Sequence, residues 1–533
     1  MVRTSKEFDL SLGEHFVVSA RKYGGGRCLI DMSGKSLSYR QALISSVAIS
    51  EQICELADGQ ERIGILLPPS VGEALTNLAV ALSGKVSVNL NYSGSEATVQ
   101  SAIEQCGIKT IISSRKFAEK LAEFGHLGGL VFLEDIVKRI GLASKAKAYL
   151  KSLFYPARVL ARAGGHERDH LATILFSSGS SGKPKGVMLS HNNIFSNTQA
   201  LRKIIWLTPK DNLCAALPFF HSFGLTCGLW LPLFSGASSV YVPNPLDSKL
   251  IEKATSENKS TILFTAPTFL LNYIRRVKPA AFSNLRLLVV GAEKLKKSIA
   301  DSFEEKFGIR PLEGYGATEL SPAVSFNLTD DLSTGKHKVG HKEGTVGFAL
   351  PDIEVKVVSV ESGELLGVGE AGLLFVKGPN VMLGYLNKEE ETAKVLRDGW
   401  YNTGDIASID EDGFITLEGR LSRFSKIAGE MVPHVGIEEI LLEGLGTHEQ
   451  VVAVTSVPDE KRGEELVVLY LDEVGDAEKL HEIISKSGVP NIWKPKRENY
   501  VPIESMPLLG TGKLDVMQVQ RIAAIAKKKS GDK

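Results

Sequence analysis

The sequence predicts an α/β protein with a large N-terminal domain of layered α/β subdomains, a β-rich subdomain and a small α+β C-terminal domain. Short apolar runs alternate with helical patterns through roughly the first 170 residues, for example at 63–67 and 86–90. Such alternation favours largely parallel sheets covered by helices. A chain of 533 residues is also too long for one core, so two or more domains are expected.

The later parts of the chain have patterns of their own. A buried-type strand at 285–291 precedes a lysine-rich helical segment that runs to Phe307. Residues 352–375 alternate short strands with glycine turns, which indicates the β-rich subdomain. After Arg420, strand patterns at 451–457 and 465–471 and helical patterns at 437–445 and 478–486 predict the small domain. The boundary therefore falls near Gly419-Arg420.

Composition excludes some classes of function. The formal net charge is zero, which argues against a nucleic-acid partner. Five cysteines are scattered without paired spacing, which indicates reduced thiols in a reducing compartment, so a cytoplasmic protein is expected. The first residues have no apolar core or cleavage site, and no secretory signal is expected.

Two stretches have unusual charge. Residues 212–246 contain no Asp, Glu, Lys or Arg, but prolines interrupt them, so they predict a buried core around an apolar pocket rather than a membrane span. Residues 137–162 carry seven Lys and Arg and no acidic residue, in a basic amphipathic pattern interrupted at Pro156. This pattern fits a solvated helix packed on the body. It also fits docking on the inner face of an anionic membrane or on an acidic protein.

Phe176 to Gly186 reads FSSGSSGKPKG and directly follows the apolar run 171–175. Glycines let consecutive N–H groups point at one centre, while serines and lysines add donors and positive charge. This chemistry suits a triphosphate; the alternative is a flexible linker. The spacing does not fit a Walker A loop, because Pro184 follows Gly182-Lys183. A GxGxxG string at 367–372 opens no helix and is interpreted as a turn between strands.

Four further segments carry groups that a nucleotide enzyme needs. In EGYGATE, Tyr315 offers a flat face to a base, Thr318 can bond a phosphate and Glu319 can hold Mg²⁺. Asp405, which ends GWYNTGD, can accept both ribose hydroxyls. The other two segments are Gly419-Arg420 with Lys426 and Gly429 at the domain boundary, and the PLLGTGK string that ends at Lys513. Each string alone also fits an ordinary turn.

In this order the segments resemble the adenylate-forming (AMP-binding) superfamily, which includes acyl-CoA synthetases, aryl-CoA ligases, luciferases and peptide-synthetase adenylation domains. The resemblance covers nearly the whole chain and implies ATP and Mg²⁺ as cofactors. The nucleotide would be held by Ser177, Ser178, Gly179, Ser180, Ser181, Gly182, Lys185, Gly291, Ala292, Glu293, Glu313, Gly314, Tyr315, Gly316, Thr318, Asp405, Arg420 and Lys426. Ser177 and Glu319 would lie near the metal, and the implied catalytic residues are Lys513, Glu319, Thr318 and His221.

The resemblance also implies the reaction. A carboxylate attacks the α-phosphorus of ATP to give an acyl-adenylate and pyrophosphate, and a thiol then displaces AMP. Lys185, Lys513 and Mg²⁺ would neutralise the accumulating charge. Between the steps a mobile small domain would rotate about a hinge just after Arg420. We therefore divide the chain into an AMP-binding domain at 1–419, a hinge at 420–425 and a mobile domain at 426–533. The family often has Asp or Lys where this chain has Ser422, which leaves the hinge role of Ser422 open.

The uncharged stretch indicates the kind of acid. His221 matches the position where relatives place a residue between the nucleotide and acyl sites. An apolar tunnel could be walled by Phe219, Phe220, Phe223, Leu225 and Trp230, although core packing explains the same side chains. No Lys or Arg lies there to meet a second carboxylate, so a long-chain fatty acid fits best.

A narrower resemblance concerns the thiol. Residues 423–432, 488–490 and 506–513, with LPFFHSFGLT and GAEKL, are similar to the acyl-acyl-carrier-protein synthetase half of bifunctional 2-acylglycerophosphoethanolamine acyltransferases. No histidine has the Asp five residues later that the acyltransferase signature requires, so a stand-alone ligase is expected. Its partners would be a fatty acid and holo acyl carrier protein, an acidic protein. The cations that could meet it, which also fit a solvated face, are Lys461, Arg462, Lys494, Lys496 and Arg497.

Two alternatives stay open. A fatty acyl-CoA synthetase shares the adenylation motifs and differs only in its thiol. A non-catalytic acyl- or nucleotide-binding module could use the same fold, although the intact Lys185, Glu319, Asp405, Arg420 and Lys513 argue against it. His337 and His341 have metal-like spacing without a third ligand, and they are interpreted as solvated.

Overall fold

The larger of two mostly parallel sheets has nine strands in the order β15-β14-β13-β12-β11-β9-β10-β1-β2. The six strands from β13 to β1 in this order pair in parallel, and β2, β14 and β15 are antiparallel additions at the two edges. The strands are β1 (Arg27–Asp31), β2 (Ser36–Ser38), β9 (Asn212–Ala215), β10 (Ser238–Tyr241), β11 (Ile262–Thr265), β12 (Leu287–Val290), β13 (Leu312–Gly316), β14 (Ala323–Phe326) and β15 (Phe348–Ala349).

The second sheet has seven strands in the order β18-β8-β7-β4-β3-β5-β6. The five strands from β7 to β6 are parallel, and the β7–β8 hairpin and β18 continue the sheet with antiparallel pairs. The strands are β3 (Arg62–Ile65), β4 (Val86–Asn89), β5 (Ile111–Ser113), β6 (Leu130–Phe132), β7 (Leu171–Ser177), β8 (Lys185–Ser190) and β18 (Gly384–Tyr385).

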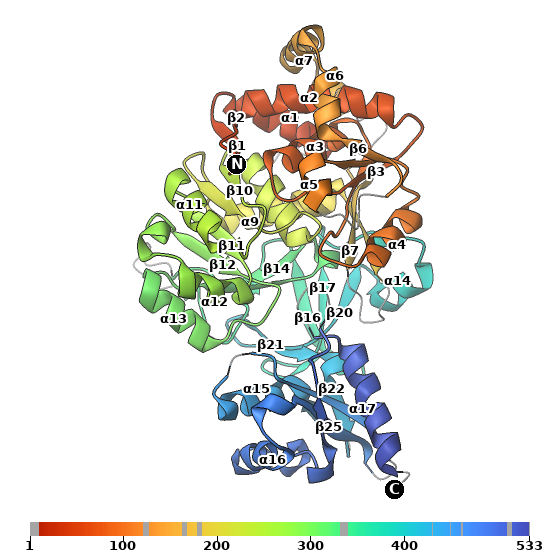
Figure 1. Ribbon diagram of the computed structural model, residues 1–533, viewed down its shortest axis with the longest axis vertical. Helices are drawn as coiled ribbons and strands as arrows, with labels where there is room; N and C mark the ends of the chain where they lie inside the picture. The colour runs from red at the N-terminus through yellow and green to blue at the C-terminus, as the bar shows by residue number, and fades with distance from the viewer. Residues whose placement is uncertain are drawn as a thin grey trace.

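The computed structural model describes residues 10–120, 127–162, 168–177, 184–330, 339–428, 430–447, 449–459, 462–508 and 514–531. Figure 1 shows the two large sheets and their helices above and the residues after Arg420 below. The helices of the upper part are α1 (Leu12–Tyr23), α2 (Tyr39–Leu56), α3 (Val71–Leu82), α4 (Glu96–Cys106), α5 (Arg115–Lys120), α6 (Leu133–Arg139), α7 (Leu142–Phe154), α8 (Ala157–Leu160), α9 (His191–Ile205), α10 (Leu231–Ser235), α11 (Ser248–Asn258), α12 (Pro267–Arg276), α13 (Lys297–Phe307) and α14 (Glu389–Val395).

Serine caps start the main helices, as their sequences favour. The side chains of Ser11, Ser38 and Ser190 each accept a hydrogen bond from the backbone N–H three residues on, and a Glu, Gln or Asn at that position bonds back. These capping boxes satisfy N–H groups that a helix start otherwise leaves unpaired. One continuous apolar core then joins α1, α2, α3 and α9 to both sheets.

The uncharged stretch lies inside this core. It forms β9, a π-helix η3 (Gly224–Trp230), α10 and β10, and nearly every residue of these elements is buried. Among the described residues no helix is long and apolar enough to span a membrane. Burial in the core therefore accounts for the absence of charge.

A third, antiparallel sheet lies between the body and the C-terminal residues. It consists of β16 (Glu354–Val358), β17 (Gly372–Lys377), β19 (Leu396–Arg397), β20 (Trp400–Ile409) and β21 (Ile415–Arg420). The GxGxxG string at 367–372 lies between β16 and β17, which pair in antiparallel. The prediction of a turn between strands is therefore confirmed.

The residues after Arg420 form an α+β unit with its own core. It contains η6 (Leu421–Arg423), β22 (Phe424–Ile427), β23 (Glu430–Pro433), β24 (Val452–Asp459), β25 (Gly463–Leu471), β26 (Tyr500–Ile503) and the helices α15 (His434–Leu445), α16 (Ala477–Lys486) and α17 (Val516–Gly531). Alternate residues of β24 face opposite sides, with Val452 and Val454 packed on α15 and α16 and Ala453 on α17. The mixed α/β architecture with a small C-terminal part matches the predicted fold class.

Candidate functional site

The β7–β8 hairpin places two of the predicted phosphate-binding residues opposite each other. Ser177 and Lys185 are partners in the strand register at its open end. The predicted residues Ser178, Gly179, Ser180, Ser181 and Gly182 lie outside the described part of the chain. The Lys185 ammonium lies 2.6 Å from the Glu391 carboxylate and 4.9 Å from the ring centre of Tyr385. Lys185 and then Lys388 hold the pKa of Glu391 down to about 2.

Glu319 lies beside the same hairpin. Its turn, η5 (Thr318–Leu320), follows β13, and its Oε1 accepts a hydrogen bond of 3.0 Å from the Tyr385 hydroxyl. Its second carboxylate oxygen has no hydrogen-bond partner among the described residues. Magnesium in nucleotide sites is commonly held by one or two carboxylates, water and the phosphates themselves. One carboxylate beside a lysine and serine hairpin fits such a site, and among the described residues no cluster of three metal-binding side chains offers another.

A buried carboxylate at the end of the GWYNTGD segment organises the next part of the site. Asp405 pairs with Arg420 in the strand register, and the Asp405 Oδ1 lies 2.8 Å from the Arg420 Nε. The Tyr315 hydroxyl donates a hydrogen bond to the other carboxylate oxygen. Burial raises the pKa of Asp405, against the effects of Arg420 and Tyr315, which favour the ionised form.

A β-bulge next to Asp405 sets the direction of its carboxylate. The pairing of β17 with β20 shifts register between Leu373 and Phe375, so Leu374 faces three residues of β20. The Thr403 hydroxyl donates to the Leu374 carbonyl at 2.9 Å, and Gly404 takes φ +71°. Glycine adopts such a φ without steric cost, which explains the TGD string.

Close backbone approach accounts for the glycines around Tyr315. A Cβ on Gly316 would lie 2.2 Å from the Pro322 carbonyl oxygen, and one on Gly314 would lie 2.9 Å from the Phe326 ring. β13 and β14 can therefore meet only with glycine at these two positions. The tyrosine between them is held in place, with its hydroxyl on Asp405.

The two predicted glutamates near the adenine site contact protein groups. Glu293 accepts a hydrogen bond of 2.5 Å from the Thr268 hydroxyl, at the start of α12. Glu313 accepts one of 3.0 Å from the Leu295 N–H. Burial raises the pKa of Glu313 to about 7. Gly291 and Ala292 follow β12, and a Cβ on Gly291 would come 3.4 Å from the Phe223 ring.

Hydrogen bonds and charge contacts thus join the hairpin, the EGYGATE segment and the TGD segment into one cluster. The connection runs from Lys185 through Tyr385 to Glu319, and electrostatic coupling between Tyr385 and Tyr401 extends it to β20, the strand of Asp405. Tyr385, Tyr401 and Glu391 were missed by sequence reasoning, because lone aromatic and acidic residues there carry no distinctive spacing.

Two further predicted residues have contacts of their own. Lys426 on β22 pairs at 2.5 Å with Glu361, in the turn between β16 and β17. His221 is exposed just before η3, with its ring centre 4.5 Å from that of Phe220. Lys513 lies outside the described residues, as does His337 of the histidine pair.

The similarity of the chain to known proteins shows its family. The model of the family described as AMP-binding enzyme matches residues 16–386. The chain belongs to the AMP-binding enzyme family. The predicted resemblance to the adenylate-forming superfamily is thereby confirmed, and the narrower resemblance to acyl-acyl-carrier-protein synthetases stays a prediction.

Relatives of this AMP-binding enzyme span nearly its whole length. The chain is 30% identical to the medium-chain fatty-acid–CoA ligase of Escherichia coli (strain K12), over 95% of this chain and 89% of that one. It is 28% identical to the long-chain-fatty-acid–CoA ligase of Bacillus subtilis (strain 168), over 91% and 90%. Its fold matches that of O-succinylbenzoate coenzyme A synthetase from Bacillus subtilis in complex with ATP and magnesium ion, with a TM-score of 0.78, 21% identity and coverage of 95% and 99%.

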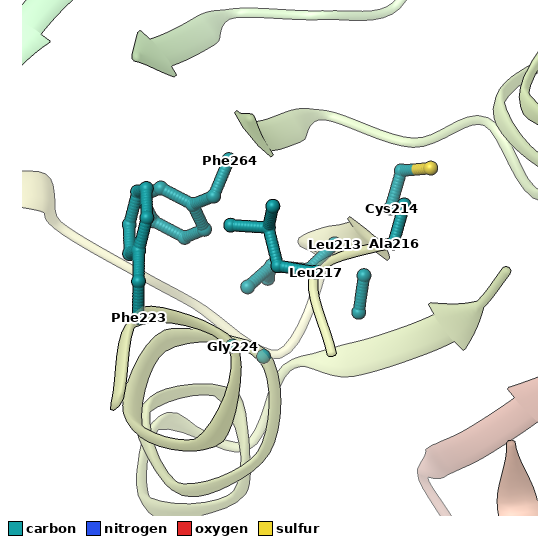
Figure 2. A pocket seen from close by; sticks show the side chains of 9 residues that line it. Leu213, Cys214, Ala216, Leu217, Phe223, Gly224 and Phe264 are labelled. Carbon is teal, nitrogen blue, oxygen red and sulfur yellow. The ribbon is translucent and has the colours of Figure 1, made fainter. Parts of the chain in front are cut away.

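An apolar cavity of this AMP-binding enzyme is lined in part by Phe223, whose ring a Cβ on Gly291 would approach to 3.4 Å. Its lining comes from β9 and the segment after it, from η3 and from β11. On one side the rings of Phe223 and Phe264 meet edge to face, with their centres 5.8 Å apart (Figure 2). The cavity measures about 10 Å³, room for about one water molecule. A fatty chain therefore requires side chains here to move.

Only one of the five side chains predicted to wall an acyl tunnel reaches this cavity. Phe223 lines it. Phe219, Phe220, Leu225 and Trp230 are at most 4% exposed and belong to the core, with Phe219 against Tyr241 and Trp230 stacked on Phe234. Core packing, the alternative stated for these residues, accounts for the four. Gly224 and Gly228 line the cavity with their backbone. The spacing of aromatic residues in the sequence could not indicate this role.

Two of the five cations predicted to face an acidic partner are paired within the small domain. Lys496 lies 2.7 Å from Glu465, and Arg497 forms an ion pair with Glu478. Arg462 and Lys494 have no ion-pair partner among the described residues, and Lys461 lies outside them. This leaves fewer cations for an acidic partner than the sequence suggested.

Proposed function

We propose that this enzyme activates a fatty acid with ATP and transfers the acyl group to the thiol of a phosphopantetheine arm. The carboxylate attacks the α-phosphorus, pyrophosphate leaves, and the arm's thiolate then attacks the acyl-adenylate and releases AMP. The observation that carries the proposal is the cluster of Tyr315, Asp405 and Arg420 beside Glu319 and Lys185. ATP and Mg²⁺ are its cofactors, with Asp405 on the ribose and Ser177 and Glu319 near the metal.

A fatty acid is supported by the cavity and by the relatives. Only apolar side chains line the cavity, among them Leu213, Phe223 and Phe264. It therefore offers no cation to a second charged group on the substrate. The two relatives described above are named for fatty acids. His221, just before η3, would mark the junction between the nucleotide and acyl sites.

We infer that the acceptor is holo acyl carrier protein, on the narrower resemblance of the small domain. Among the described residues, the exposed Arg462 and the half-buried Lys494 are the cations of this predicted face without an ion pair, and they could meet its acidic surface. Coenzyme A carries the same arm and is the second candidate, favoured by the names of the relatives.

We propose a hinge at 420–425, between domains at 1–419 and 426–533, with Lys513 and the Gly429 segment exchanged by its rotation. Arg423 lies 2.6 Å from Glu438 in a buried pair, and Ser425 bonds to His434. Because both partners belong to α15, Arg423 and Ser425 would move with the small domain. The small domain would then rotate about the backbone bonds of Leu421 and the exposed Ser422.

The state of the cysteine thiols supports a cytoplasmic location. Four of the five cysteines are buried and all are free, which suits a reducing, cytoplasmic setting.

A product assay tests these assignments. The enzyme receives ATP, Mg²⁺ and palmitate, with holo acyl carrier protein and coenzyme A in parallel tubes. Acyl-carrier-protein product with little acyl-CoA supports the first acceptor, and the reverse result replaces it with coenzyme A. Failure to form an adenylate with fatty acids of any length, read as pyrophosphate release, would sink the fatty-acid assignment.

A further inference from the structure

The helix α7 turns its large apolar side chains away from the protein. The residues that it buries are small, Ala148 at 0% and Ser152 at 3% exposure. Leu142 is 86% exposed, Leu150 53% and Phe154 76%. An amphipathic helix of a globular protein normally packs its apolar stripe on the core, so this arrangement is inverted.

The outward side chains form a continuous stripe. Their spacing of i, i+4, i+7, i+8 and i+11 puts them on one helical face. The stripe, which we call the α7 outer face, consists of Leu142, Ala146, Tyr149, Leu150 and Leu153. Phe154, the last residue of α7, is 76% exposed, and Tyr155 and Val159, which follow the helix, are 44% and 55% exposed.

Specific contacts fix the helix in this orientation. Arg21 of α1 donates from Nε and Nη2 to the Ser152 carbonyl at 3.0 and 2.9 Å. Lys151 pairs with Glu51 of α2, and Lys147 lies 3.8 Å from the same carboxylate. The inner face is thus tied to α1 and α2, so rotation of α7 to bury its outer face would break these bonds.

Positive charge is concentrated in and next to α7. Residues 137–162 carry seven cations and no carboxylate. Lys147 and Lys151 are paired with Glu51, and Lys138 lies 3.9 Å from Asp135. Arg139, Lys145 and Arg158 are exposed, and none has an ion-pair partner in the part of the chain that the structure describes. An apolar stripe flanked by unpaired cations is the composition of helices that lie in the plane of an anionic bilayer surface.

The position of α7 leaves the rest of the molecule free. Figure 1 shows α6 and α7 at one extreme of the long axis and α15, α16 and α17 toward the other. A surface held at α7 would therefore not cover the small domain.

We propose that the α7 outer face docks on an anionic lipid bilayer, with Leu150, Leu153 and Phe154 entering the headgroup boundary and Lys145 and Arg158 meeting lipid phosphates. A second copy of this chain suits the face less, since a two-fold contact would oppose like charges. The docking is independent of which thiol accepts the acyl group.

Vesicle co-sedimentation of the full chain tests the docking. The probes are phosphatidylcholine vesicles with and without 30 mole per cent phosphatidylglycerol, about the charge density of an anionic leaflet. Binding is expected only with phosphatidylglycerol, and it should weaken as salt is raised. We expect Leu150→Asp/Leu153→Asp to lower the partition coefficient at least about tenfold, and Lys145→Gln/Arg158→Gln about fivefold for each cation lost.

Matched controls separate the face from general effects. Leu365 and Val368, at 71% and 70% exposure, lie in the turn between β16 and β17, so Leu365→Asp/Val368→Asp should leave binding unchanged. Lys249→Gln/Lys253→Gln on α11 serves the same purpose for charge. Thermal melting confirms that each variant is folded.

Several results would overturn the proposal. One is no binding of the wild type to phosphatidylglycerol vesicles at low salt. A second is equal binding by folded wild type and Leu150→Asp/Leu153→Asp. A third is a dimer that this substitution abolishes without any vesicle binding, which would assign the face to a second copy. A fourth is wild-type vesicle binding by Lys145→Gln/Arg158→Gln combined with slower acyl transfer to acyl carrier protein, which would assign the cations to an acidic protein.

Discussion

Tyr315 donates a hydrogen bond to Asp405, a residue 90 positions further along the chain, and so ties the EGYGATE segment to the TGD segment. Arg420 reaches the same carboxylate from the neighbouring strand, at 2.8 Å. Because Arg420 is also the last residue before η6, the carboxylate that we assign to the ribose contacts the start of the proposed hinge. Nucleotide binding and domain rotation would thus share one side chain.

The first prediction concerns this carboxylate. Asp405→Asn keeps the shape but removes the charge that holds Arg420 and accepts the ribose hydroxyls. Hydrogen bonds to a charged group contribute about 1.5–3 kcal/mol, so the Kd for ATP should rise about 10- to 100-fold in calorimetric titration. Asp398→Asn, in a carboxylate that is 89% exposed, is the control and should bind as wild type. An unchanged Kd in Asp405→Asn would remove Asp405 from the nucleotide site.

The second prediction concerns the lysine of the hairpin. Lys185 is held by Glu391 at 2.6 Å, and the triphosphate must compete with this carboxylate. Glu391→Gln should therefore strengthen ATP binding, by about two- to fivefold for a partly exposed pair. Equilibrium titration measures the effect, with Glu390→Gln on the same helix as control. Weaker binding would show instead that Glu391 helps to position Lys185 for the phosphates.

The third prediction concerns the acyl cavity. Phe223→Ala should enlarge the space beside Gly291, and each additional buried methylene stabilises binding by about 0.8 kcal/mol, or about fourfold. The ratio of kcat/KM for palmitate to that for octanoate should rise in adenylation assays. Phe414→Ala truncates another buried aromatic side chain in the turn between β20 and β21, and it should leave this ratio unchanged. A ratio that does not change in Phe223→Ala would place the acyl chain elsewhere.

The sequence predicted the elements better than their contacts. Strand–helix alternation and local turn chemistry are visible along the chain, so β3, β4 and β12, the turn at 367–372 and the helices α15 and α16 were foreseen, whereas α17 was not. The partners of Lys185 and Glu319 were not, because Tyr385 and Glu391 become their neighbours only when β18 pairs with β8. Aromatic spacing around Phe220 could not separate cavity wall from core, since both require apolar side chains. The inverted face of α7 was also hidden, because periodicity shows an apolar stripe but not which way it points.

The last prediction follows from the buried carboxyl group of Glu313. Burial raises its pKa from the usual 4.5 to about 7, so at intermediate pH the folded chain keeps a proton that the unfolded chain has released. Unfolding then releases a proton, and the stability falls as the pH rises from about 4.5 to 7. The loss amounts to at most about 3 kcal/mol, since each pKa unit corresponds to 1.36 kcal/mol. The side chain introduced by Glu313→Gln is neutral at every pH, so this variant does not lose stability in this way.

Melting temperatures at pH 5.5 and pH 8 reveal this difference. The wild type should lose several degrees more than Glu313→Gln between these two values, because other titrating groups are common to both proteins and cancel in the comparison. Glu305→Gln, in an exposed carboxylate of α13, should follow the wild type. Bound ATP would add stability to both proteins, so the measurement uses the nucleotide-free enzyme. Equal slopes for wild type and Glu313→Gln would mean that Glu313 ionises at an ordinary pH and that solvent reaches its carboxyl group.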